Sequence, residues 1–254
     1  MSGRLAVVGL GPGDARFLTG EARDALADAE AVYGYGPYLD RVPFRAGQAR
    51  HASDNREELA RAGAALDHAA AGTRVAMVSG GDPGVFAMAA AVCEAVETGP
   101  DRWRAVDLAV VPGVTAMLAV AALAGAPLGH DFCAISLSDN LKPWPLIARR
   151  LALAAEAGFA IALYNPVSRA RPTQLGTAFA VLSEHLPPTT PVIFGRAAGR
   201  PDEHVAVVTL AAAADEPADM ATLVIVGSPA TRVVARPGRP PLVYTPRGAV
   251  EARR

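Results

Sequence analysis

The 254-residue chain predicts an α/β fold made of two α/β domains, with a mainly parallel N-terminal sheet and a mixed C-terminal sheet. Short apolar runs alternate with helical patterns along most of the chain, which is typical of parallel sheets covered by helices. Nearer the C-terminus the apolar runs follow one another across short turns, which favours antiparallel pairing. We expect the domains to span 1–124 and 125–254, because the Gly-Ala-Pro-Leu-Gly segment at 125–129 is typical of a linker.

The predicted strands are short runs rich in β-branched and other apolar residues. In chain order they are 5–8, 31–33, 75–79, 107–111, 133–137, 159–164, 192–196, 204–209 and 223–226.

Helices are predicted between most of these strands, where alanine, leucine and acidic residues recur at helical spacing. In the segment 53–71, Asp54 stands three residues before Glu57, which resembles a capping box at a helix start. The predicted helices are 19–29, 53–71, 85–97, 115–124, 145–157 and 173–184.

Two predicted strands run directly into glycine-rich turns. Gly-Leu-Gly-Pro-Gly-Asp at 9–14 follows the first strand, and Gly-Gly-Asp-Pro at 80–83 follows the strand at 75–79. Glycine lets backbone approach a ligand where a Cβ would collide. Because ligands of open α/β sheets collect at the carboxyl ends of strands, we expect a binding site at this sheet edge.

The first turn does not fit the usual nucleotide motifs. A dinucleotide fingerprint requires glycine at the sixth position, which is Asp14 here, and an acidic end to the next strand, which instead runs into 34–37. A triphosphate loop requires Gly-Lys-Ser or Gly-Lys-Thr, whereas the chain's one lysine is Lys142. The sequence therefore disfavours nicotinamide and nucleoside triphosphate sites.

Composition further narrows the class of protein and the partners that can be expected. A net charge of −1 gives no overall field that would attract nucleic acid or an anionic membrane, so neither is expected as a partner. Cys93 and Cys133 lack metal-site spacing, so no metal is expected, and a reducing cytoplasm is the default location. The segment 108–129 is uncharged, but Pro112-Gly113 interrupts it, which favours a buried strand, a turn and a buried helix over a membrane span.

Several separate segments together resemble the tetrapyrrole methylases, which use S-adenosylmethionine and build cobalamin and sirohaem. The matching segments are 9–14, 79–86 and 111–116, in the order and spacing of the family. Within the family, the segments 34–39, 129–141, 142–145 and 159–169 resemble the branch that acts on precorrin-3B. The resemblance continues through 222–227 to 245–248 and so covers nearly the whole chain.

The resemblance implies two α/β domains with the cofactor in the cleft between them, a homodimer, and an activity without metal or nucleotide. It implies methylation of precorrin-3B at C17 with ring contraction to precorrin-4, and conversion of S-adenosylmethionine to S-adenosylhomocysteine. Two alternatives within the family stay open, methylation of another precorrin carbon and a cobalt-containing substrate. A binding or regulatory module without catalysis is the alternative from a different class.

By resemblance, the cofactor contacts come from both domains. The residues that the family's motifs place there are Pro12, Gly81, Asp82, Val85, Phe86, Thr115, Ala116, Tyr164, Asn165, Arg196, Ala197, Thr222 and Leu223. Amides at Thr115 and Ala116, which open a predicted helix, suit an anionic group. Two purely structural alternatives remain: Val85 and Phe86 could belong to the hydrophobic core, and Asp82 could cap the next helix.

Ring contraction, as the resemblance implies it, removes the proton of a C20 hydroxyl while a lactone opens and a carbon–carbon bond migrates. An acid and a base assist such a step. The favoured catalytic candidates are Ser138, Asp139 and Lys142, which lie just beyond a predicted strand, together with Tyr35. Further residues that could face the substrate are Tyr38, His130 and Asn140. Alternatively, Asp139 begins a turn and Trp144 fills the domain interface.

A flat ring with many carboxylates needs cations at its rim, and guanidinium groups bind carboxylates in pairs of hydrogen bonds. The candidates in predicted loops are Arg41, Arg45, Arg50, Arg56, Arg169 and Arg171, of which two or three are expected to serve.

Overall fold

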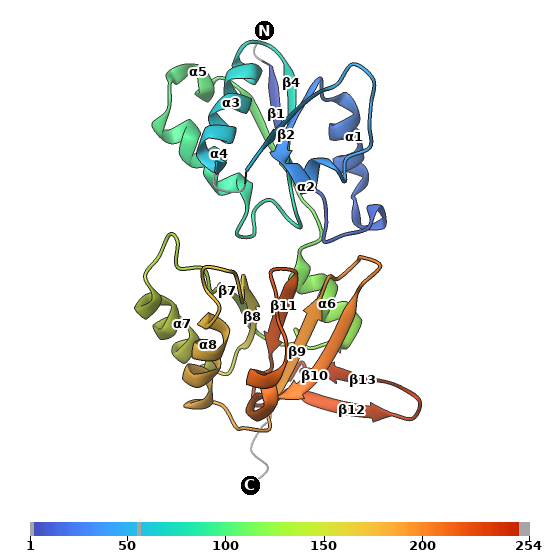
Figure 1. Ribbon diagram of the computed structural model, residues 1–254, viewed down its shortest axis with the longest axis vertical. Coiled ribbons are helices and arrows are strands. Elements are labelled where there is room, and N and C mark those ends of the chain that lie inside the picture. Colours follow the sequence, from blue (N-terminus) through green and yellow to red (C-terminus); the bar gives the residue numbers. More distant parts are fainter. Residues whose placement is uncertain (1–2, 55–56, 249–254) are drawn as a thin grey trace. The chain divides into compact units, whose positions relative to one another are not determined.

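The computed structural model describes residues 3–54 and 57–248, which form two compact units that divide between Ala116 and Met117 (Figure 1). The sequence places the boundary at 124/125 instead. Helix α6 (Ala116–Ala124) accounts for the difference, because it packs closely on a strand of the second unit. A Cβ added to Gly195 would lie 2.2 Å from Val120 Cγ2 of this helix.

The first unit is built on a five-stranded sheet in the order β3-β2-β4-β1-β5. All four neighbouring pairs are parallel. Its strands are β1 (Arg4–Gly9), β2 (Ala31–Tyr35), β3 (Ala49–Ser53), β4 (Arg74–Ser79) and β5 (Asp107–Val111). The chain leaves the neighbouring strands β1 and β4 in opposite directions across the sheet, an arrangement that favours ligand binding at their carboxyl ends.

Helices cover both faces of this sheet (Figure 1). α1 (Gly20–Asp28) packs against alternate residues of β1 such as Ala6 and Val8, while α3 (Glu58–Ala70) and α4 (Met88–Thr98) pack against Leu5 and Val7. This double burial explains why β1 and β4 read as continuous apolar runs. The remaining short elements are 3-10 helix η1 (Ala15–Phe17), α2 (Gly36–Leu39) and α5 (Asp101–Arg104).

The second unit contains a mixed five-stranded sheet in the order β10-β9-β11-β8-β7. β7 and β8 pair in parallel, whereas β11 runs antiparallel to β8 and β9, and β10 antiparallel to β9. The strands are β7 (Phe132–Ser136), β8 (Ala160–Tyr164), β9 (Pro191–Arg196), β10 (His204–Thr209) and β11 (Thr222–Val226). α7 (Trp144–Glu156), α8 (Gln174–Ser183) and 3-10 helix η2 (Leu210–Asp215) cover one face (Figure 1).

A small third sheet joins a segment near the start of the second unit to segments near its C-terminal end. β12 (Arg232–Arg236) and β13 (Arg239–Tyr244) form an antiparallel hairpin, and β6 (Gly125–Ala126) pairs in parallel with β13. Thr245 Oγ1 donates a 2.6 Å hydrogen bond to the carbonyl of Pro127. The segment 125–129, expected to be a linker, is therefore held inside the second unit.

These two sheets confirm the predicted fold class. Each predicted strand is present, with bounds that differ by at most two residues. The uncharged segment 108–129 divides into β5, a turn, α6 and β6, and no described helix has the length and apolar character that crossing a membrane requires.

Of the strands within residues 3–54 and 57–248, four were not predicted, for recognisable reasons. β3 has the sequence Ala-Arg-His-Ala-Ser, without apolar alternation, because it lies at a sheet edge. Pro237 lies between β12 and β13, and Pro240 and Pro241 lie within β13. Proline normally marks a loop, so the sequence did not indicate these strands. β6 has two residues and is defined by its partner alone.

Two helices start at least three residues later than predicted. The helix expected over 53–71 begins at Glu58, because 49–53 forms β3, although Asp54 N–H does donate to Glu57 Oε2 at 3.2 Å as in a capping box. The helix expected over 85–97 begins at Met88. Phe86 has φ of 51°, a left-handed conformation that a helix cannot contain.

Candidate functional site

The turns that follow β1 and β4 are joined backbone to backbone. Gly11 N–H donates to the Gly81 carbonyl at 3.1 Å, and Gly81 N–H donates to the Gly11 carbonyl at 2.9 Å. Both residues have φ of +68°, a conformation that favours glycine. The two turns thus form one small antiparallel bridge at the carboxyl edge of the first sheet.

Glycines in these turns also allow the turns to pack on each other. A Cβ added to Gly113, in the turn after β5, would lie 2.3 Å from the Gly81 carbonyl oxygen. A Cβ on Gly9 would lie 2.7 Å from Gly113 N. The sequence predicts close approach by a ligand at the glycines of the turns after β1 and β4. At Gly9 and Gly113 the close approach is between backbone segments of the protein itself.

Asp82 joins the turn after β4 to the turn after β5. Its Oδ1 accepts a 2.8 Å hydrogen bond from Gly84 N–H, and its Oδ2 accepts a 3.0 Å bond from Gly113 N–H. The alternative that Asp82 caps the next helix is wrong, because α4 begins at Met88 with Ala87 as its N-cap and no side chain bonds to that cap; the bond to Gly84 is a local turn bond. The second bond adds a link between turns that the sequence reasoning did not foresee.

Thr115 and Ala116 stand where α6 begins. Thr115 is buried, and Ala116 is the first helical residue. Pro12 and Val85 are partly buried, whereas the side chain of Phe86 is half-exposed at 51%. The alternative that Phe86 belongs to the core is thus wrong.

Tyr35 and Tyr38 lie at the same carboxyl edge, after β2. Their rings meet edge to face with centroids 5.5 Å apart. A Cβ on Gly80 would lie 2.7 Å from the Tyr38 ring, so Tyr38 packs directly against the turn after β4. Tyr35 is partly exposed beside it.

Two of the candidate rim arginines have structural roles. Arg41 Nη2 donates to the carbonyls of Leu10 and Gly11, both at 2.8 Å. Arg50 donates to the carbonyls of Leu39, Val42 and Pro43 at 2.8–3.2 Å. Arg45 and Arg169 are exposed, and Arg56 lies outside the described residues.

In the second unit, the predicted cofactor residues gather at one edge of the sheet. β11 runs antiparallel to β8 and β9, so its first residues lie beside the last residues of those strands. The register pairs Thr222 with Arg196 and Leu223 with Gly195. The residues brought to this edge are Tyr164, Asn165, Arg196, Ala197, Thr222 and Leu223.

Arg196 is held by two carboxylates at this edge. Its Nε donates to Asp219 Oδ2 and its Nη1 donates to Asp202 Oδ2, both at 2.8 Å. Burial raises the pKa of Asp219, but hydrogen bonds from Arg196 and Thr222 outweigh this and lower it overall. The cation is neutralised within the protein, so any cofactor contact at this position falls to the backbone or the side-chain stem.

Among the residues that the structure describes, three that are not glycine have positive φ: Phe86 at 51°, Asn165 at 52° and Ala197 at 51°. Each of them is also a predicted cofactor residue. Left-handed backbone costs roughly 1–2 kcal/mol for a residue with a Cβ. Strain of this kind collects at functional sites, so its distribution supports the predicted positions.

Tyr164 and Asn165 each make a specific bond at the end of β8. The Tyr164 hydroxyl accepts from Met117 N–H at 3.2 Å, near the start of α6. Asn165 Nδ2 donates to Ser136 Oγ at 2.9 Å, and that oxygen also accepts from Ser138 N–H at 3.3 Å. The Tyr164 bond joins β8 to α6, and the bonds to Ser136 Oγ tie the end of β7 and its loop to the loop after β8.

The predicted catalytic residues Ser138 and Asp139 converge on Arg171. Arg171 Nη1 donates to Ser138 Oγ and lies 3.9 Å from Asp139 Oδ1. Lys142 is partly buried, and burial, followed by the charge of Arg150, lowers its pKa. Tyr35 belongs to the first unit, so the structure unites two of the four candidates.

Sequence reasoning missed the residues that act between loops. Asp219 and Ser136 were not candidates, and Arg171 was expected to hold substrate instead of its own protein. Their signal is weak because each bond joins segments more than twenty residues apart. Of these residues, Asp219 has a partner close in the sequence: it stands three residues before Thr222 and accepts a 2.9 Å hydrogen bond from the Thr222 hydroxyl.

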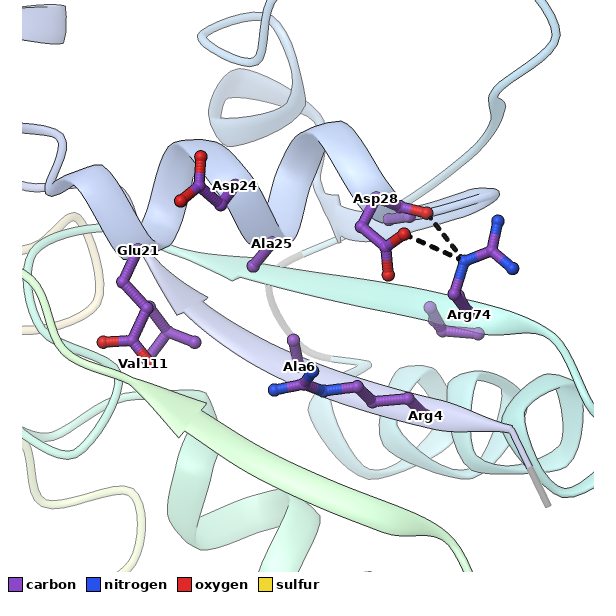
Figure 2. A pocket seen from close by; sticks show the side chains of 10 residues that line it. Arg4, Ala6, Glu21, Asp24, Ala25, Asp28, Arg74 and Val111 are labelled. Carbon is purple, nitrogen blue, oxygen red and sulfur yellow. Dashed lines mark hydrogen bonds and ion pairs between the residues drawn. The ribbon is translucent and has the colours of Figure 1, made fainter.

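A pocket of about 240 Å³ lies elsewhere, between α1 and the strands of the first unit (Figure 2). Charged side chains line it, but Arg74 Nε is paired with Asp28 at 3.2 Å. None of the predicted site residues lines this pocket. Among the residues that the structure describes, no group of three or more His, Cys, Asp or Glu side chains is placed to hold a metal ion.

Comparison with known proteins supports the resemblance seen in the motifs. The profile of the Tetrapyrrole (Corrin/Porphyrin) Methylases matches residues 4–214. A precorrin-3B C(17)-methyltransferase of Sinorhizobium sp is 67% identical and aligns over 97% of both chains. A probable cobalt-factor III C(17)-methyltransferase of Salmonella typhimurium is 42% identical, over 96% of this chain and 98% of the relative.

Solved structures show the same fold. The crystal structure of the methyltransferase CobJ matches with a TM-score of 0.90 and 49% identity, covering 96% of this chain and 100% of that one. A uroporphyrin-III C-methyl transferase from Thermus thermophilus, complexed with S-adenyl homocysteine, matches with a TM-score of 0.69 and 27% identity, covering 89% and 97%.

Proposed function

Since the chain belongs to the tetrapyrrole (corrin/porphyrin) methylases, we propose that it transfers the methyl group of S-adenosylmethionine to C17 of precorrin-3B, with ring contraction to precorrin-4. The observation that carries this proposal is the 67% identity to the Sinorhizobium enzyme named for that reaction. Alignment over nearly the full length of both chains extends the likeness to both units.

The same comparison favours the metal-free substrate over its cobalt-containing analogue. Identity to the Salmonella relative, whose name specifies cobalt-factor III, is 42%, against 67% for the relative named for precorrin-3B. The specific segments after β2 and β7 are where a substrate-binding difference between branches is expected. A sibling activity at another ring carbon is disfavoured on the same ground.

The residues present fit S-adenosylmethionine on structural grounds. Phe86, Asn165 and Ala197 adopt left-handed backbone at sheet edges where ligands of α/β proteins collect. The Thermus relative in complex with S-adenyl homocysteine supports the choice of ligand. The residues that would hold the cofactor are Pro12, Gly81, Asp82, Val85, Phe86, Thr115, Ala116, Tyr164, Asn165, Arg196, Ala197, Thr222 and Leu223.

The bound sulfonium supplies an electrophilic methyl group, so the protein's main task is to align it with the carbon nucleophile and exclude water. The bridge between Gly11 and Gly81 and the Asp82 link keep the turns of the first unit in a fixed arrangement. The bonds of Asn165 and Tyr164 do the same in the second unit.

Ring contraction also requires proton transfer, which we assign to polar side chains at the strand ends. Asp139, with 38% of its side chain exposed, can accept a proton, and Ser138 can donate a hydrogen bond beside it. The pKa of Lys142 is lowered, so a larger fraction of its amine is neutral at physiological pH than in an exposed lysine. Tyr35 provides a phenol from the first unit. The proposal also includes a homodimer located in the cytoplasm.

Incubation with precorrin-3B and S-adenosylmethionine tests the proposal. We expect one added methyl group at C17 and the acetyl-bearing, ring-contracted product, detected by mass spectrometry and NMR. A methyl group at another carbon would show a sibling activity. Cofactor binding without turnover would indicate a binding module without catalysis. Asp139→Ala should impair product formation more than cofactor binding, and unchanged turnover in that variant would remove Asp139 from the mechanism.

A further inference from the structure

Two loops lie side by side at the carboxyl edge of the second sheet, because β7 and β8 are parallel neighbours. The loop after β7 carries the candidates Ser138 and Asp139. The loop after β8 carries Arg171, whose side chain is 13% exposed, much less than a surface arginine. An arginine buried to this degree requires partners, and its partners lie in both loops.

Arg171 makes a connected set of contacts. Its Nε donates to Ser168 Oγ at 3.1 Å, which fixes the guanidinium plane within its own loop. Backbone bonds between Ser168 and Arg171, at 3.2 and 3.0 Å, close that loop. Its Nη1 then reaches across to donate to Ser138 Oγ and lies 3.9 Å from Asp139 Oδ1.

We propose that Arg171 is a positioning residue that sets opposite roles for Ser138 and Asp139, holding the serine hydroxyl as a hydrogen-bond donor and the aspartate as an acceptor toward the substrate. This inference rests on the proposed function and deepens it. It replaces the expectation that Arg171 grips a substrate carboxylate, since its guanidinium is already engaged by side chains of both loops.

The role of Ser138 follows from the chemistry of its partner. A guanidinium has donors and no acceptor, so the serine proton cannot point toward Arg171 and must be donated to another group. A hydroxyl whose oxygen accepts from a cation is also a stronger donor, because successive hydrogen bonds polarise one another. Ser138 is therefore suited to stabilise a substrate oxygen by donating a hydrogen bond, and poorly suited to act as a base.

The role of Asp139 follows from charge. A carboxylate has acceptor sites only, and Asp139 Oδ1 lies 3.9 Å from the Arg171 guanidinium, whose positive charge attracts that oxygen. Asp139 is more exposed than Arg171, so its carboxylate can face the substrate while the arginine remains behind it. Arg171 thus supports both candidate groups without needing to contact the reacting atoms.

The loops keep a second connection that does not involve Arg171. Ser136 Oγ accepts from Asn165 Nδ2 at 2.9 Å and from Ser138 N–H at 3.3 Å, so the bases of the two loops stay joined when the guanidinium is removed. Substitution of Arg171 should therefore change the orientation of the Ser138 hydroxyl more than the fold. Lysine cannot replace the planar fork that contacts two hydroxyls at once.

Variants Arg171→Gln, Arg171→Lys, Ser138→Ala and the double variant Arg171→Gln/Ser138→Ala test the inference. Arg149→Gln on α7 is a matched control, since Arg149 is exposed and belongs to the same unit. We expect kcat for methylated, ring-contracted product to fall on the order of 10- to 100-fold in both Arg171 variants. The Kd for S-adenosylhomocysteine should change by less than about twofold, a difference of about 0.4 kcal/mol or less.

Turnover of the double variant distinguishes a positioning role of Arg171 from a merely structural one. If Arg171 acts through Ser138, the double variant should be no slower than the slower single variant, whereas independent roles multiply. Ser168→Ala, which loosens the guanidinium within its own loop, should reproduce a milder form of the same loss. This variant also keeps the test open if Arg171→Gln unfolds, as judged by thermal denaturation.

Three results overturn the inference: turnover of Arg171→Gln equal to that of Arg149→Gln, multiplicative effects in the double variant, or a loss confined to cofactor affinity. If the unmodified chain forms no methylated product from precorrin-3B, the proposed function itself fails, and the inference fails with it. Product from the unmodified chain with normal turnover in the Arg171 variants refutes only the role of Arg171.

Discussion

Asp82 Oδ2 accepts a 3.0 Å hydrogen bond from the backbone N–H of Gly113, so one carboxylate joins the turn after β4 to the turn after β5. Its other oxygen holds Gly84 N–H at 2.8 Å. The residue that looks like a ligand contact in the sequence also maintains the arrangement of the turns that would receive the ligand.

Asp82→Asn should weaken this arrangement. The amide can accept on one side only, so one of the two N–H groups loses its acceptor, at a cost of about 1–3 kcal/mol. We expect a lower urea midpoint and a weaker Kd for S-adenosylhomocysteine by calorimetry. Asp24→Asn on the surface of α1 is the control. A variant with wild-type stability and affinity would show that the link is dispensable.

Gly113→Ala should be more damaging, because its Cβ would lie 2.3 Å from the Gly81 carbonyl oxygen, and backbone must move to relieve the contact. Overpacking of this kind costs about 1–3 kcal/mol. In contrast, Gly176→Ala within α8 meets no atom within 4 Å and should stabilise the protein by about 0.5–1 kcal/mol. Chemical denaturation of both variants tests the contrast, which fails if their signs agree.

Phe86→Gly should separate stability from function. Phe86 is half-exposed and has φ of 51°, so glycine relieves left-handed strain but also loses the buried half of the ring. Because the strain and the lost burial are each about 1–2 kcal/mol, we expect the unfolding free energy to change by no more than about 1 kcal/mol and cofactor affinity to fall. Thermal denaturation and calorimetry on the same sample measure the two quantities. Loss of stability with intact affinity would assign Phe86 a structural role.

His51 should make the first unit less stable in acid. Its ring stacks on Tyr33 at 4.3 Å, and burial, followed by the charge of His68, lowers the pKa of His51. The unfolded chain therefore binds more protons than the folded one as the pH falls below about 6.5, and the linkage relation makes stability decrease there.

His51→Phe keeps the aromatic stacking but removes this titration. Its unfolding free energy should therefore fall less steeply than that of the unmodified chain between about pH 7.5 and 5.5. Urea denaturation at a series of pH values gives both slopes. Parallel slopes would mean that His51 does not contribute to acid sensitivity.

Lys142 should determine a basic limb of the rate profile if it takes part in proton transfer. Burial and the Arg150 charge lower its pKa, so Arg150→Gln should raise that pKa and move the limb to higher pH. Arg149→Gln is the neighbouring control. The dependence of kcat on pH measures the shift, and an unmoved limb in Arg150→Gln would exclude Lys142 as its origin.

The predictable part of the fold came from hydrophobic pattern. Buried strands such as β1 and β4 are continuous apolar runs because helices cover both faces, so their positions could be predicted within one residue. β3 could not, since an edge strand of polar residues carries no such pattern. The short β6 exists because β13 pairs with it from more than one hundred residues away.

The sequence by itself determined the α/β class, the order of the strands along the chain, and the turns at whose ends the family's motifs stand, because these depend on local pattern and residue type. Only the tertiary structure decided which side chains in those turns meet. Arg171 beside Ser138 and Asp82 beside Gly113 are joined by sheet pairing, not by chain proximity. Hydrogen bonds between distant segments leave no periodic trace in a sequence, since each needs one donor and one acceptor brought together by the fold.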